Sequence, residues 1–126
     1  MKKIEAIIRE EKLDAVKEAL AAKGFLGLTV TPVTGRGQQK GLLLQWRAGE
    51  YRVDLLPKIK LEVVVADKDY PAVLETICQA ARTGDIGDGM IFVLPVEQIC
   101  RVRTGETGEA ALSRNNNKLP VPAHKA

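Results

Sequence analysis

Three short segments, far apart in a chain of 126 residues, have the composition of a phosphate-binding site. Two are rich in glycine, GRGQQKG at 35–41 and TGDIGDG at 83–89, and the third is RVR at 101–103. Glycine lets backbone N–H groups approach an anion closely. Arg101 and Arg103, two apart on a segment expected to be extended, would project to the same side and clamp oxygen atoms. Together the segments predict an anion site, although a glycine pair alone is more often a turn and Arg-x-Arg a solvated surface.

The residue types that are missing limit the possible chemistry. Ser113 is the only serine and His124 the only histidine, and both lie in the polar segment 113–126, which we expect to be a disordered C-terminal tail. A Ser-His-Asp hydrolase and a histidine-built metal centre are therefore disfavoured. Cys78 and Cys100 have neither a CxxC spacing nor a histidine nearby, and we expect both to be buried thiols. The sequence predicts a binding protein and not an enzyme.

The charge distribution narrows the class of ligand. The formal net charge is +3, and residues 36–60 carry six Lys/Arg against only Glu50 and Asp54. Such a short basic stretch suits small anions, and the few scattered aromatic residues argue against direct nucleic acid binding. No segment approaches the roughly 18 apolar residues of a membrane span. We therefore expect a cytoplasmic protein without membrane insertion.

The elements that must position these segments follow from the hydrophobic pattern. Strands are predicted over 2–8, 27–34, 58–66 and 90–96, with extended chain continuing to Arg103. Pro32 is acceptable only if the second strand lies at a sheet edge or contains a bulge. Apolar residues at three- and four-residue intervals predict helices between 13 and 24 and over 69–82.

This order is β-α-β, a long loop, and β-α-β again. It predicts an α+β fold of the ferredoxin-like βαββαβ type, with a four-stranded antiparallel sheet and two helices on one face. One domain would span 1–112, with a long loop at about 37–55 between the second and third strands. The other face of the sheet, carrying Ile7 and Val64, would be left bare, which implies self-association.

Several segments also carry a resemblance to a known family. MKKIEAII, KLDAVKEAL, GQQKG through RAGEYRVDLLPK to LEVVVAD, AARTGDIGDG, IFVLPVE and RVRTGETGEAAL resemble the successive signature segments of the PII nitrogen-regulatory signal-transduction family. The resemblance runs without a gap from residue 1 to about 112, and TGDIGDG and RTGETGEAAL are its most specific parts.

The resemblance implies a homotrimer that binds ATP or ADP in clefts between subunits. Arg101 and Arg103 would come from the neighbouring subunit. The adenine would lie against Ile7, Thr29, Glu62 and Val64. The implied nucleotide-binding residues are Ile7, Thr29, Glu62, Val64, Gly35, Gly37, Gln38, Gln39, Gly87, Asp88, Gly89, Arg101 and Arg103.

It also implies a second ligand and a modification site. Gln39 matches a magnesium ligand, and 2-oxoglutarate would lie against Gln39, Lys40, Gly41 and Lys58. Tyr51 matches the residue that some relatives modify with a nucleotidyl group. Met90 stands where the family usually has a lysine that steadies the terminal phosphate of ATP.

The resulting hypothesis is a regulator of nitrogen and carbon metabolism that contacts other proteins through its long loop. By resemblance, these partners would be metabolic enzymes, an ammonium transporter or transcription regulators. Two alternatives remain at this point. One is a slow nucleotide-hydrolysing enzyme using Glu62 or Asp88 as base, and the other is an oligomeric interaction module in which both glycine-rich segments are only turns.

Overall fold

The computed structural model describes residues 1–37, 42–46, 49–53 and 55–112, and within 42–53 the backbone only. The elements follow one another in the order β1 (Lys2–Ile8), η1 (Glu10–Lys12), α1 (Leu13–Ala22), β2 (Thr29–Gly35), β3 (Leu42–Trp46), β4 (Gly49–Val53), β5 (Leu56–Val65), α2 (Tyr70–Ala81), β6 (Gly89–Pro95) and η2 (Gly108–Leu112).

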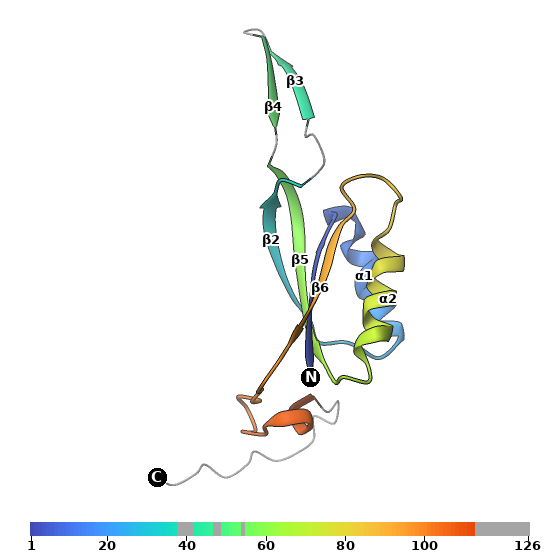
Figure 1. Ribbon diagram of the computed structural model, residues 1–126, viewed down its shortest axis with the longest axis vertical. Helices are drawn as coiled ribbons and strands as arrows, with labels where there is room; N and C mark the ends of the chain where they lie inside the picture. The colour runs from blue at the N-terminus through green and yellow to red at the C-terminus, as the bar shows by residue number, and fades with distance from the viewer. Residues whose placement is uncertain (38–41, 47–48, 54, 113–126) are drawn as a thin grey trace.

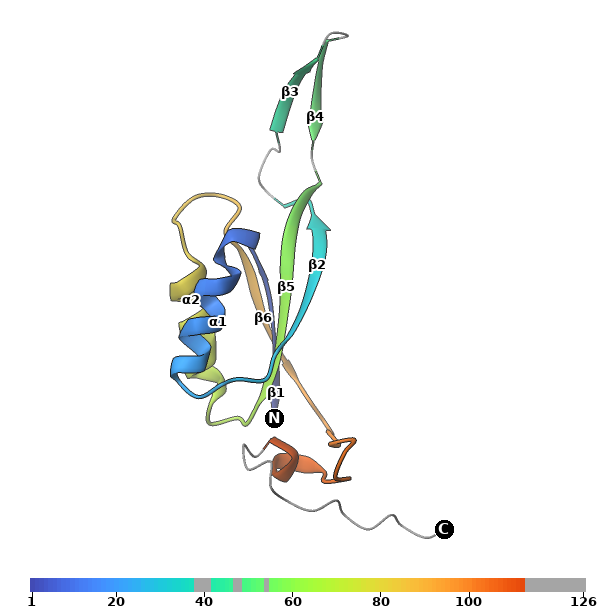
Figure 2. The same cartoon turned by 180° about the vertical axis from the view of Figure 1, so that it is seen from behind.

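The main sheet has four strands in the order β2-β5-β1-β6, and every neighbouring pair is antiparallel. Both α-helices cover the same face of this sheet (Figures 1 and 2). The predicted ferredoxin-like arrangement is therefore confirmed, with the four core strands within two residues of their expected positions. Pro32 lies in β2, an edge strand, where its missing N–H costs no hydrogen bond to a further strand.

The core lies between the sheet and the two helices. Alternate residues of β1 and β5 point into it, because side chains of a strand alternate between the two faces. The helices add residues at three- and four-residue intervals. The fully buried members include Ile4, Ala6, Ile8, Leu61, Val16, Leu20, Val73 and Ile77.

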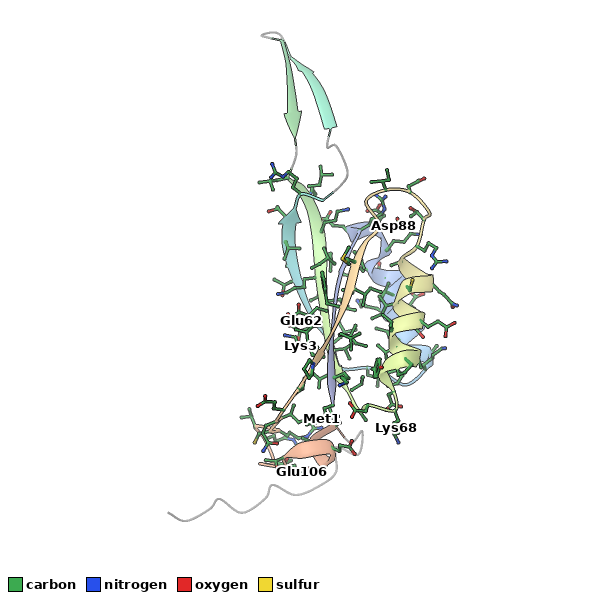
Figure 3. All side chains as sticks on the ribbon, in the orientation of Figure 1. Met1, Lys3, Glu62, Lys68, Asp88 and Glu106 are labelled. Carbon is green, nitrogen blue, oxygen red and sulfur yellow. The ribbon has the colours of Figure 1, made fainter. Side chains whose placement is uncertain are left out.

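The second face of the sheet is open, and its centre carries charge. The Lys3 ammonium contacts the carboxylates of Glu5 at 3.0 Å and Glu62 at 2.5 Å, and Lys60 approaches Glu62 at 3.7 Å. Figure 3 shows Lys3 and Glu62 side by side on this face. The Glu62 pKa is lowered, mainly by the hydrogen bond from Lys3. Such a face combines ion pairs with apolar residues that are only half covered.

Residues 42–46 and 49–53 form a separate two-stranded sheet of β3 and β4, with Leu44 opposite Tyr51. This hairpin extends beyond the end of β2 and β5, away from the core (Figure 1). The long segment predicted to leave the domain between the second and third core strands therefore contains its own strand pair. Its two strands pair with each other and not with the main sheet.

Two expectations about the C-terminal part are wrong. The chain after β6 is not extended to Arg103, because Arg101 N–H donates to Glu106 O at 2.8 Å and Gly105 N–H to Arg101 O at 2.7 Å. Gly105, with a φ of 74°, permits this tight turn. Cys100 is exposed and not buried, since the turn carries it outside the core, and Cys78 is half-buried.

None of the described helices is long and apolar enough to cross a bilayer. The predicted tail, 113–126, lies outside the described residues.

Candidate functional site

The glycine-rich segment at 83–89 forms a turn around the carboxylate of Asp88. Asp88 Oδ2 accepts hydrogen bonds from the N–H groups of Thr83 and Gly84, both at 2.9 Å. Asp88 Oδ1 accepts from the Thr83 hydroxyl at 2.5 Å and from Arg9 Nε at 3.0 Å. The hydrogen bonds from Thr83, followed by those from Gly84 and Arg9, hold the pKa of Asp88 far below its ordinary value. The carboxylate thus organises the turn while remaining ionised.

Cations from two strand ends reach the carbonyl groups of the same turn. Arg9, which directly follows β1, donates from Nη2 to Ile86 O at 3.0 Å. Lys58, near the start of β5, donates from Nζ to Gly87 O at 2.5 Å. The turn is therefore tied to both central strands of the sheet.

The end of the turn also requires glycine for steric reasons. Gly87 and Gly89 have φ values of 103° and 105°, which L side chains rarely adopt. A Cβ on Gly89 would lie 1.7 Å from Ile7 O. Ile8 pairs with Gly89 in the sheet register, so the close approach follows from strand pairing.

Several predicted site residues gather at this end of the sheet. Ile7, Asp88 and Gly89 line one groove of about 830 Å³ between α2 and β6, together with Met90. Gly35 pairs with Leu56 two residues before Lys58, and Gly37 follows shortly after. We call this set the turn-end group; its members are Ile7, Gly35, Gly37, Lys58, Gly87, Asp88 and Gly89. Gln38, Gln39, Lys40 and Gly41 lie outside the described residues.

A second set of predicted residues lies at the other end. Thr29 pairs with Glu62, and both line a cavity of about 370 Å³ with Val64. Val64 also lines a neighbouring cavity of about 520 Å³ that includes Arg101. Arg101 donates from Nη2 to Ala111 O at 2.5 Å. We call this set, which also includes Arg103, the C-segment group.

Within one chain Arg101 and Arg103 do not reach the turn at 83–89, although Ile7 pairs with Lys60, two residues from Glu62. From Gly89 to Pro95, β6 alone spans about 20 Å at roughly 3.3 Å per residue. Figure 3 shows Asp88 at one end of the sheet and Glu106, in the turn after Arg103, at the other. Two donors can share one phosphate only if each lies about 3 Å from it, which this separation forbids.

Sequence reasoning missed Arg9 and Thr83, which hold Asp88 in place. The sequence does contain a signal for Arg9. It directly follows β1, and the turn at 83–89 directly precedes β6, so antiparallel pairing of these strands brings the two together. Among the described residues, no cluster of three or more His, Cys, Asp or Glu could hold a metal ion. Gln39, the predicted magnesium ligand, and the side chain of Tyr51 are not described.

A ferredoxin-like sheet with a hydrogen-bonded glycine turn at one end and a projecting strand pair defines a small α+β domain. The family model for "Nitrogen regulatory protein P-II" matches residues 1–106. The chain belongs to the P-II family of nitrogen regulatory proteins, which are signal-transduction regulators.

Individual relatives agree with this membership. "Nitrogen regulatory protein P-II" of Cereibacter sphaeroides is 59% identical over 112 residues, covering 89% of this chain and 100% of the relative. The protein of the same name from Rhizobium meliloti is 58% identical over 112 residues, with the same coverage. "Nitrogen regulatory protein P-II 2" of Methanothermobacter thermautotrophicus is 55% identical over 112 residues, covering 89% of this chain and 97% of the relative. The resemblance predicted from the signature segments is confirmed.

Replacement of Asp88 by asparagine tests the organisation of the turn. Because the folded-state pKa is depressed, the carboxylate stabilises the fold above its unfolded pKa of about 4, and this contribution disappears as pH falls through the folded value. Asp88→Asn should lower the urea midpoint at pH 7, and the difference from the unchanged protein should shrink below about pH 4. The exposed Asp85 offers the control Asp85→Asn, which should leave the midpoint unchanged. Equal midpoints for Asp88→Asn and the unchanged protein at pH 7 would contradict this role.

Proposed function

We propose that this P-II family member binds adenine nucleotide, ATP or ADP, and uses it to control an interaction with other proteins. The observation that carries the proposal is the turn at 83–89. Its backbone is held rigidly by Asp88, Arg9 and Lys58 beside the apolar side chains of Ile7 and Met90. A rigid glycine turn suits phosphate groups, and an adjoining apolar surface suits a base or ribose.

A complete site requires a second copy of the chain. Arg101 and Arg103 follow β6 at the end of the sheet opposite the turn, so they would reach the turn only from a neighbour. The open face, with Phe92 46% and Leu94 39% exposed, offers apolar area for such a contact. We propose the homotrimer that the resemblance implies, in which each cleft combines one group from each of two subunits.

The same end of the sheet would take the effector. We propose that 2-oxoglutarate and magnesium bind beside the nucleotide, with Lys58 pairing with a carboxylate of 2-oxoglutarate. Lys58 lies at the base of the segment that carries β3 and β4. An anion bound there is placed to bias the position of the hairpin.

The output is proposed to be regulation and not catalysis, which fits a family of regulatory signalling proteins. The hairpin extends from the core and forms no part of the main sheet. It would contact metabolic enzymes, an ammonium transporter or transcription regulators. Tyr51, in β4, is the proposed modification site.

Calorimetric titration with ATP and ADP tests nucleotide binding. Met90 follows the turn and is 62% exposed, where a lysine would add a charged hydrogen bond to the terminal phosphate. Such a bond is worth roughly 1.5–3 kcal/mol, or about tenfold to a hundredfold in affinity. Both nucleotides should bind, ADP should compete well with ATP, and Met90→Lys should raise the preference for ATP at least about tenfold.

Ala15→Lys, which adds the same charge at an exposed position of α1 that does not line this groove, is the matched control and should leave the preference unchanged. Absence of binding by either nucleotide would overturn the proposed function. A preference of the unchanged protein for ATP beyond about a hundredfold would instead contradict the role given to Met90.

Deletion of residues 43–52 tests the hairpin as the output surface. Among the described strands, β3 and β4 pair only with each other, so the pairing of the main sheet does not include them. The deletion variant should keep its oligomeric state and its ADP affinity. On an affinity column it should no longer retain the partner proteins that the full-length chain retains. Tyr51→Ala should weaken that retention in the same direction. Loss of the oligomer on deletion, measured by light scattering, would show that the hairpin belongs to the core.

A further inference from the structure

The carbonyl groups of Ile86 and Gly87 belong to consecutive peptide units of the turn. Arg9 Nη2 holds the first carbonyl at 3.0 Å and Lys58 Nζ holds the second at 2.5 Å. No peptide bond of the described residues is cis. In a trans peptide unit the C=O and the N–H of the same plane point in opposite directions. The two cations therefore also fix the directions of the N–H groups of Gly87 and Asp88, which point away from them.

These two N–H groups have no hydrogen-bond acceptor among the described residues. Gly87 and Asp88 are both half-buried, so the N–H groups lie at a partly sheltered surface. The φ of 103° at Gly87 is the feature that lets two successive planes take such an orientation. Successive backbone N–H groups that lack an acceptor in a turn are suited to bind an anion.

The negative charge of Asp88 does not oppose an anion at this place. Its carboxylate accepts four hydrogen bonds from Thr83, Gly84 and Arg9, and Arg9 is a full positive charge 3.0 Å away. Lys58 adds a second positive charge on the carbonyl side of the turn. Among the charged groups that bond within the turn, Arg9 and Lys58 carry two positive charges against the one negative charge of Asp88, which favours an anionic ligand over a neutral one.

We propose that Arg9 and Lys58 are positioning residues for the phosphate groups, acting through the backbone and not by contact with the ligand. Arg9 fixes the plane between Ile86 and Gly87, and Lys58 fixes the plane between Gly87 and Asp88, so that two N–H groups are aligned before the ligand arrives. This inference rests on the proposed function, because it assigns a mechanism to the phosphate end of that site. It also gives Lys58 a role in the absence of any effector.

The affinities of Arg9 and Lys58 variants for ADP and adenosine distinguish two roles of these cations: positioning the backbone N–H groups, and attracting the phosphates by charge alone. Arg9→Met and Lys58→Met should each weaken ADP binding by about tenfold while changing adenosine binding less than about twofold, because only the phosphates need the aligned N–H groups. Arg9→Lys keeps the charge but cannot hold both the Asp88 carboxylate and the Ile86 carbonyl. It should therefore lose nearly as much ADP affinity as Arg9→Met.

Matched controls remove the same charge without touching the turn. Lys60→Met changes the same face of β5, where Lys60 approaches Glu62, and Lys12→Met changes the end of η1. Neither should alter the ratio of ADP to adenosine affinity. Restoration of ADP binding by Arg9→Lys, or an equal loss in Lys60→Met, would show that the cations act through charge alone and would overturn the proposal.

The amide resonances of Gly87 and Asp88 can be measured directly by NMR, even if ADP does not bind. In ¹⁵N-labelled protein, inorganic pyrophosphate should shift the amide resonances of Gly87 and Asp88, and Lys58→Met should abolish the response at Asp88. A pyrophosphate response without ADP binding would leave this inference standing while the proposed function fails. Amides that respond to neither ligand in the unchanged protein would overturn it.

Discussion

The length of the sheet strands is the constraint on which the rest of the molecule depends. β5 has ten residues and runs from the base of the hairpin to the cavity beside Val64, so it holds the two ends of the domain apart by roughly 30 Å. The antiparallel pairing with β1 fixes where along β5 each open-face residue of β1 lies. Arg101 and Arg103, beyond one end of the sheet, cannot reach the turn at the other end by a side-chain movement, so a site that used both would need a second chain.

At one end of the sheet, a turn that is hydrogen-bonded to the core lies near a strand pair that is separate from the main sheet. The turn at 83–89 is joined to β1 through Arg9 and to β5 through Lys58, while β3 and β4 pair with each other and with no other described strand. Lys58 thus lies between a part that is fixed and a part that pairs only with itself. An anion bound near Lys58 is placed to affect both.

The sequence was sufficient for the arrangement of the core, because alternation in β1 and β5 and the helical stripe of α2 depend on local periodicity. It also located the glycine turn, whose conformation needs residues without a Cβ. It did not indicate the turn after Cys100, because the bonds of Arg101 to Glu106 and Gly105 compete with an extended conformation that the RVR pattern favours. Arg9 was not predicted either, because its position directly after β1 becomes informative only once strand pairing brings Ile8 beside Gly89.

Subunit mixing tests most directly whether the site is shared between two chains. Gly37→Asp places a carboxylate in open space within the turn-end group, and Arg103→Ala removes a cation from the C-segment group. Each variant alone should bind no ADP. In trimers formed from an equal mixture, about a quarter of the clefts should combine an intact group from each partner, and that fraction of ADP binding should return. A mixture that binds no more ADP than the separate variants would contradict a site built between subunits.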